Sequence, residues 1–83
     1  MDLIFSPQAL RDLKKLGKQM QKRIIEKLEF FATSPEPLNF AEKLTDSNRG
    51  EWRFRIGDYR VIFDLKGKQI AILKIGHRKE IYK

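Results

Sequence analysis

The chain has 83 residues, a length that suits a single modest core, and we expect residues 1–83 to form one domain. Hydrophobic residues make up 41% of the sequence, which excludes a disordered tail, and no apolar run approaches the roughly 20 residues that span a membrane. There is no cysteine for a disulfide or a thiolate metal site, and residues 1–6 lack the basic start and long apolar run of a signal peptide, so we expect a cytoplasmic protein.

The first part of the sequence has the pattern of a strand followed by two helices. Asp2–Phe5 is a short apolar run, and Ser6 and Pro7 then supply an N-cap and a first-turn proline. Gly17 is predicted to end this helix, and a second helix should cover residues 18–33. Its apolar stripe consists of Met20, Ile24, Ile25, Leu28 and Phe31. Two helices joined by so short a turn should form an antiparallel pair.

The second part of the sequence predicts strands. Prolines end the second helix, and residues 35–49, which are long for a structureless connection, should pack down through a helical turn. Three strand-like runs follow at residues 51–56, 59–65 and 69–75, with a turn at Gly57 and Asp58 between the first two. Because neither helix can bury its stripe alone, we expect an α+β two-layer fold. The first strand and a helical hairpin would pack on one face of a small antiparallel sheet, and its other face would stay uncovered.

Arginines alternate with apolar residues on the first strand of the hairpin. Side chains two apart in a strand point to the same face, so Arg53 and Arg55 should stand together, and Arg60 can join them from the second strand. Each guanidinium is permanently charged and presents a planar fork of donors that suits phosphate. The net charge is +1 over residues 1–48 and +6 over residues 49–83. This surface predicts a polyanionic partner, and a solvated basic face without a ligand is the alternative.

Residues near the C-terminus extend this candidate site. The full cationic cluster consists of Arg53, Arg55, Arg60, Lys74, His77 and Arg78, with Tyr82 beside it. Such a set can bind a phosphodiester and stabilise the charge that builds on phosphorus. In RNA the 2′-hydroxyl supplies the nucleophile, so no metal is required, and the sequence shows no cofactor motif or metal-ligand spacing.

Proton carriers are few in this cluster. His77 alone titrates near neutrality without perturbation, although a lone histidine after a glycine is more often a loop residue. Glu51 and Asp64 are the carboxylates expected nearest the basic face, either as a base or as ion-pair partners of an arginine. Tyr82 could instead cover the edge of the sheet.

Three segments carry motifs in a definite order: residues 5–16 (FSPQALRDLKKL), 50–63 (GEWRFRIGDYRVIF) and 75–82 (IGHRKEIY). Together they resemble the first strand and helix, the central hairpin, and the last strand and tail of the RelE/ParE superfamily of bacterial toxin–antitoxin toxins. The resemblance covers nearly the full length. It implies an antiparallel sheet with a helical hairpin on one face, the same fold that the residue pattern predicts.

Within this superfamily, RelE-like members are ribosome-dependent endonucleases that cut mRNA in the ribosomal A site. Their sites use basic residues on the first hairpin strand, an arginine on the second, an arginine after the last strand and a tyrosine in the tail. Those positions fall here on Arg53, Arg55, Arg60, Arg78 and Tyr82. The two first-strand positions are lysines in the best-known RelE pattern, so the proton-carrying role stays open, with His77 as a candidate. We expect Lys74, Lys79 and Lys83 to add RNA contacts.

The resemblance leaves three functions open. The first is a toxin that inhibits translation as an mRNA interferase, by metal-independent 2′-hydroxyl attack that leaves a cyclic phosphate. The second is a ParE-like inhibitor of DNA gyrase, and the third is a non-catalytic module that only binds its antitoxin. Each version implies a small acidic antitoxin as partner, operator DNA bound only through that antitoxin, and no membrane partner. The first adds mRNA on the ribosome.

Overall fold

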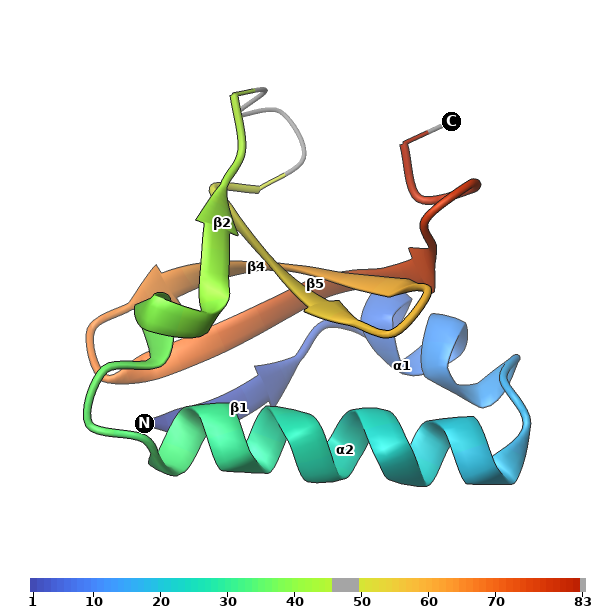
Figure 1. Ribbon diagram of the computed structural model, residues 1–83, viewed down its shortest axis with the longest axis horizontal. Coiled ribbons are helices and arrows are strands. Elements are labelled where there is room, and N and C mark those ends of the chain that lie inside the picture. The colour runs from blue at the N-terminus through green and yellow to red at the C-terminus, as the bar shows by residue number, and fades with distance from the viewer. Residues whose placement is uncertain (46–49, 83) are drawn as a thin grey trace.

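The chain folds into one sheet with helices on one face and the C-terminal tail on the other (Figure 1). The computed structural model describes residues 1–45 and 50–82. The elements are β1 (Asp2–Phe5), α1 (Pro7–Lys14), α2 (Lys18–Thr33), the 3-10 turn η1 (Pro37–Phe40), β2 (Ala41–Lys43), β3 (Trp52–Ile56), β4 (Tyr59–Lys66) and β5 (Gln69–His77). The α+β class and both helices are confirmed. Gly17, however, does not end α1, because that helix stops at Lys14 and Gly17 caps the start of α2 with an ordinary φ of −62°.

The sheet has the strand order β1-β5-β4-β3-β2. Strands β3, β4 and β5 pair antiparallel in turn, as predicted, and β2 pairs antiparallel with β3. Strand β1 lies parallel to β5, with Asp2 beside Gln69 and Phe5 beside Ile72. The prediction of a purely antiparallel sheet is therefore wrong at this one pair. Helices follow β1 directly, so β1 has no hairpin partner and joins the sheet beside the last strand.

Strand β2 is missing from the sequence prediction. The helical turn expected within residues 35–49 is present as η1, and the chain then enters β2, which pairs with β3 so that Glu42 lies beside Arg53. Three residues are too few to show an alternation of apolar and polar side chains. This short strand nevertheless brings a carboxylate to the basic face.

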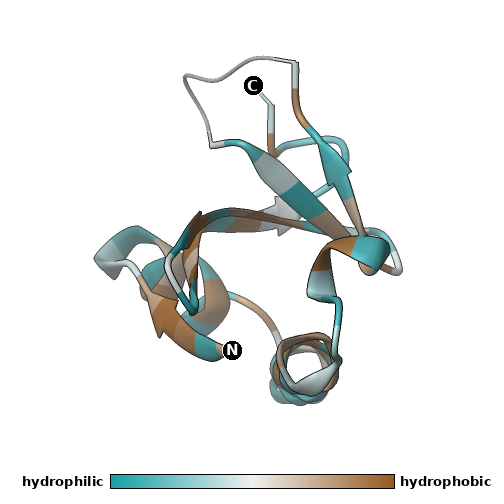
Figure 2. Ribbon diagram, turned by 90° about the vertical axis from the view of Figure 1, so that its left-hand side faces the viewer, coloured by the Kyte–Doolittle hydropathy of each residue, from teal (hydrophilic) through white to brown (hydrophobic). Residues whose placement is uncertain are grey.

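The hydrophobic core lies between the sheet and the helices. In Figure 2, where α2 is seen nearly end-on, the helix lies below the sheet. It turns Ile24, Leu28 and Phe31 inward, as the 3.6-residue period predicts, and all three are buried. The ring centroid of Phe31 lies 4.6 Å from that of Phe54, which lies 4.2 Å from that of Phe63. This stack connects α2 to two adjacent strands.

Neither helix in the described part of the chain has the length and apolar character that a membrane span requires.

Strand β5 contains one extra residue, Leu73. Ile72 faces the core, and the next paired residue is Lys74, which lies beside Ile62 of β4. Because the pairing skips one residue, Lys74 turns to the face away from the helices while Ile75 returns to the core. Strict alternation would have placed Lys74 on the same side as Ile72.

The start of α1 holds this extra residue in place. Ser6 caps the helix, as predicted, and donates its hydroxyl hydrogen to the Leu73 carbonyl at 2.9 Å. Asp12 accepts a hydrogen bond from the backbone N–H of Ile75 at 3.0 Å. The backbone carbonyl and N–H groups around the extra residue of β5 are therefore hydrogen-bonded to side chains from the N-terminal part of the sequence.

The face away from the helices is partly covered, so the prediction that it stays uncovered is wrong. After β5 the tail turns back over the sheet, and buried Ile81 packs on Gly76, where a Cβ would lie 3.0 Å from the Ile81 side chain. Lys74 Nζ donates to the Ile81 carbonyl at 3.2 Å. Burial of Ile81 contributes about 1.5–3 kcal/mol, enough to hold the tail in a defined position.

Gly50 makes a close contact on this same face. A Cβ at Gly50 would lie 2.6 Å from Cγ2 of fully buried Ile62, and its φ of +131° strains any other residue. We expect Gly50→Ala to lower the free energy of unfolding in urea by about 2–3 kcal/mol, because side chain and backbone must both shift. Gly67→Ala is the matched control, since Gly67 also has a positive φ, +60°, but nothing within 4 Å of its Cβ position. Equal losses at the two positions would contradict this explanation.

Candidate functional site

Three arginines project from the sheet on the face away from the helices. In the β3–β4 pairing, Arg55 lies directly beside Arg60, and Arg53 stands two residues along β3 on the same face. Their strand neighbours Phe54 and Val61 are fully buried on the helix side. The hairpin therefore brings these three guanidinium groups to one surface, as the sequence alternation predicts.

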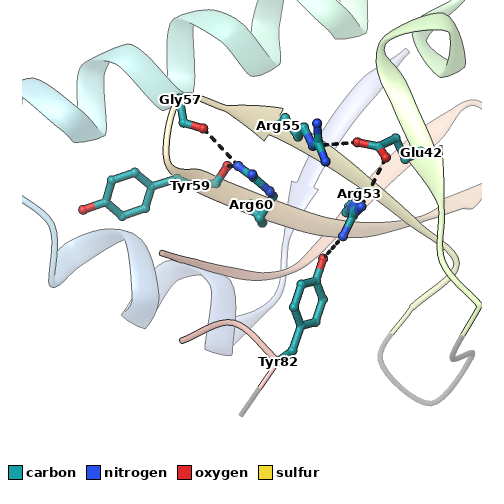
Figure 3. A network of polar contacts seen from close by, with 7 residues as sticks. All are labelled: Glu42, Arg53, Arg55, Gly57, Tyr59, Arg60 and Tyr82. Atoms are coloured by element: carbon teal, nitrogen blue, oxygen red, sulfur yellow. Dashed lines mark hydrogen bonds and ion pairs between the residues drawn. The ribbon is translucent and has the colours of Figure 1, made fainter. Parts of the chain in front are cut away.

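A carboxylate from β2 joins two of these arginines. Glu42 Oε2 lies 3.1 Å from Arg53 Nη2, and Glu42 Oε1 lies 2.8 Å from Arg55 Nε (Figure 3). The side chains of Glu42 and Arg55 are 45% and 60% exposed, so these are surface ion pairs that water and salt weaken. The hydrogen bond from Arg53, with the charges of Arg53, Arg55 and Arg60, lowers the pKa of Glu42 below its ordinary value. Glu42 is therefore ionised at neutral pH.

Sequence reasoning missed Glu42, and no signal in the sequence would have found it. Glu51 and Asp64, the carboxylates that the sequence predicts nearest the arginines, have a different role. Asp64 Oδ1 accepts a hydrogen bond from the backbone N–H of Glu51 at 2.7 Å and so ties the start of β3 to β4. No ion pair between either of these two acids and an arginine occurs among residues 1–45 and 50–82.

Arg53 is partly enclosed by its neighbours in the cluster. Its side chain is 23% exposed, against 60% for Arg55, and its Nη1 donates to the Tyr82 hydroxyl at 2.6 Å (Figure 3). Hydrogen bonds to Tyr82 and then to Glu42 raise the pKa of Arg53, against the effect of burial. Its Nε is buried and has no acceptor in the described part of the chain. The predicted tail tyrosine thus reaches the first-strand arginine.

Arg60 and Arg78 are both anchored at the β3–β4 turn. Arg60 Nη1 donates to the carbonyls of Gly57 and Tyr59, each at 3.0 Å. The backbone N–H of Arg78 donates to the Asp58 carbonyl at 2.7 Å, and Arg78 Nε lies 3.7 Å from Asp58 Oδ1. Arg60 thus lies between the Glu42 cluster (Glu42, Arg53, Arg55 and Tyr82) and Arg78 at the turn.

The structure does not bring His77 to the arginines. His77 lies beside Tyr59 in the β4–β5 pairing, and the two ring centroids are 5.6 Å apart in an edge-to-face contact. By the alternation of β4, Tyr59 and Arg60 point to opposite faces, so His77 lies on the helix side. Its Nδ1 accepts from the backbone N–H of Lys79 at 3.1 Å. The prediction that His77 belongs to the cationic cluster is therefore wrong.

The predicted lysines have different positions. Lys74 faces the arginine side, where its Nζ is bound to the tail carbonyl of Ile81. Lys79 is exposed in the turn that follows β5. Lys83 lies outside the described residues. Of the residues predicted for the site, Arg53 is joined directly to Tyr82 and, through Glu42, to Arg55, with Arg60 alongside and Arg78 at the turn.

Comparisons with known proteins agree on one group of toxins. Residues 3–82 match the family described as ParE toxin of type II toxin-antitoxin system, parDE. Toxin RelG of Mycobacterium tuberculosis is 31% identical over 81 residues, covering 95% of this chain and 92% of the relative.

Two solved structures have the same fold. The toxin–antitoxin complex RelBE2 of Mycobacterium tuberculosis matches with a TM-score of 0.77 and 29% identity, covering 93% of this chain and 96% of that one. The RelE–RelB complex of Pyrococcus horikoshii matches with a TM-score of 0.71 and 31% identity, covering 95% and 96%. The resemblance predicted from three sequence motifs is confirmed: the chain belongs to the RelE/ParE family of toxins of type II toxin–antitoxin systems.

Proposed function

We propose that this toxin is a ribosome-dependent mRNA endonuclease that inhibits translation by cleaving mRNA without a metal. The observation that carries the proposal is the carboxylate of Glu42 between Arg53 and Arg55. A carboxylate and a phosphate present the same kind of paired anionic oxygens to a guanidinium. In the free toxin Glu42 therefore marks the position where two arginines would hold the scissile phosphate.

Exchange of Glu42 for phosphate is physically easy. The Glu42 side chain is 45% exposed, and ion pairs that solvent reaches from one side are weak. A phosphodiester brings the same charge, and counterion release from RNA adds a favourable term. Arg53 and Arg55 would then neutralise the phosphate, and Arg60 would stabilise the charge that builds on phosphorus.

Cleavage by the 2′-hydroxyl needs a proton acceptor. The 2′-oxygen attacks phosphorus, the bond to the 5′-oxygen breaks, and the product is a cyclic phosphate with a free 5′-hydroxyl that takes its proton from solvent. Glu42, displaced from the arginines, is the carboxylate nearest the bound phosphate and accepts the 2′-hydroxyl proton. A bound phosphate also draws the arginine charge away from Glu42, which makes the carboxylate a stronger base. Tyr82, fixed on Arg53, would position the adjacent nucleotide.

The proposed protein partner is an acidic antitoxin. Related toxins were solved as complexes with antitoxins, and a net charge of +7 suits an acidic protein. Such a partner would compete with RNA for the arginine surface and would supply any contact with operator DNA.

Inhibition of DNA gyrase is the second candidate, because the matching family model is named for a ParE toxin. The two functions differ in what induction of the toxin does to cells. New mRNA 5′ ends within translated codons support the nuclease, whereas a DNA damage response without such ends supports gyrase as the target. Normal growth with folded toxin would leave only the non-catalytic antitoxin-binding module.

The test removes the pair of arginines that hold Glu42. We expect Arg53→Ala/Arg55→Ala to abolish growth arrest and the new mRNA ends, because loss of one transition-state donor alone costs about 10²–10³ in rate. The control is Lys66→Ala/Lys68→Ala, which removes the same charge around the β4–β5 turn, away from the cluster. Full arrest by the arginine variant, shown to be folded by circular dichroism, would refute the nuclease proposal.

A further inference from the structure

A second group of guanidinium groups surrounds the β3–β4 turn. Arg23 reaches this turn from α2: its guanidinium atoms lie 3.4–3.7 Å from the position that a Cβ on Gly57 would occupy. Arg78 is held at the next residue of the turn, where its backbone N–H donates to the Asp58 carbonyl. Arg60 donates to the Gly57 carbonyl. Three arginines from a helix, a strand and the tail therefore meet at two consecutive residues.

Arg23 differs from the other two arginines of this group. It is exposed, and among the described residues it has neither a hydrogen bond nor an ion pair. Its N–H donors are available, and its guanidinium lies beside the open Cβ position of Gly57.

Arg78 is held by its backbone but only weakly by its side chain. Its Nε is 3.7 Å from Asp58 Oδ1, and the two side chains are 55% and 69% exposed. An ion pair of this length and exposure is weak and easily exchanged for another anion. Asp58 forms an ion pair with Arg78 at this turn, where three guanidinium groups, those of Arg23, Arg60 and Arg78, come together.

We infer that Arg23 and Arg78 form a second phosphate-binding position, which holds the backbone of single-stranded RNA next to the scissile phosphate. This inference rests on the proposed function. Arg60 lies between the two positions, since it is fixed to the turn and also acts on the charge of Glu42. An RNA strand can therefore run from the Glu42 cluster across Arg60 and around the turn to the helix layer. Contacts of this kind go to phosphates and carry no base preference.

Removal of Arg23 tests this position. The probe is a 2′-O-methyl RNA oligonucleotide, which cannot be cleaved, and its affinity is measured at several low salt concentrations. We expect Arg23→Ala to weaken binding about 3- to 10-fold and to reduce the salt slope by about 0.7, the value for one contact to a single strand. Arg23→Lys should keep most of the slope, because it keeps the charge.

The matched control is Lys27→Ala, which removes the same charge from an exposed position one turn further along α2. If Arg23→Ala and Lys27→Ala give the same affinity and slope, the second phosphate position is wrong. Arg53→Ala/Arg55→Ala in the same assay separates this failure from that of the proposed function. If Arg53→Ala/Arg55→Ala loses binding and Arg23→Ala binds as before, only the second position is refuted. If Arg23→Ala weakens binding and Arg53→Ala/Arg55→Ala binds as before, the proposed function is refuted.

Discussion

Glu42→Gln is expected to strengthen RNA binding and at the same time to abolish cleavage. The amide keeps the shape of the side chain but no longer competes with phosphate for Arg53 and Arg55. Loss of this competing charge should raise the affinity for a 2′-O-methyl oligonucleotide several-fold, since surface pairs contribute about 0–1 kcal/mol each. Cleavage of mRNA on programmed ribosomes should fall by about 10²–10⁴, the usual contribution of a general base.

A rise in RNA affinity together with a loss of cleavage cannot come from unfolding of the variant, because unfolding would lower both affinity and cleavage. Glu51→Gln is the control, because it makes the same change at an exposed residue just before β3. The hydrogen bond of Glu51 to Asp64 comes from its backbone N–H, which the substitution leaves in place. If Glu42→Gln cleaves as fast as the unmodified toxin, Glu42 is not the proton acceptor. If cleavage rises together with affinity, Glu42 acts only as an anion that competes with the substrate.

Phe54→Ala is expected to cause the largest loss of stability, about 3–5 kcal/mol in urea denaturation. Phe54 is fully buried between Phe31 of α2 and Phe63 of β4, so its removal leaves a cavity in the stack that joins the two layers. A loss of this size is a large fraction of the 5–15 kcal/mol that stabilises a typical domain. Because Arg53 and Arg55 flank Phe54 on β3, we also expect weaker RNA binding at temperatures where part of the variant is unfolded.

Phe30→Ala gives the comparison for this prediction. Phe30 is 56% exposed on α2, so the same chemical change should cost about 1 kcal/mol or less. A similar loss for the two phenylalanines would show that the stack through Phe54 is not the main link between helix and sheet.

Regular periodicity made most of the fold predictable. The apolar stripe of α2 repeats every three to four residues over four turns, and both ends of that helix match the prediction. The alternation in β3 likewise placed Arg53 and Arg55 on one face with Arg60. In both cases one simple period holds throughout the element, and the packing agrees with it.

The site was less predictable where a single residue breaks the period or an element is very short. The extra residue Leu73 changes which side chains of β5 face the helices, and it turns His77, which pairs with Tyr59, to the helix side and away from Arg60. Glu42 lies on a strand of three residues, whose position depends on pairing with β3 and not on its own pattern. Long-range pairing of this kind leaves no local trace in the sequence.

The hydrogen bonds that join Ser6 and Asp12 to β5 span 67 and 63 positions of the chain. Closing loops of that length costs entropy before any contact offsets it, so these bonds belong to the late steps of folding. We therefore expect β5 to reach its final register only when α1 has docked. The position of Tyr82 depends on that register. The opening and closing segments of the sequence should accordingly unfold as one cooperative unit.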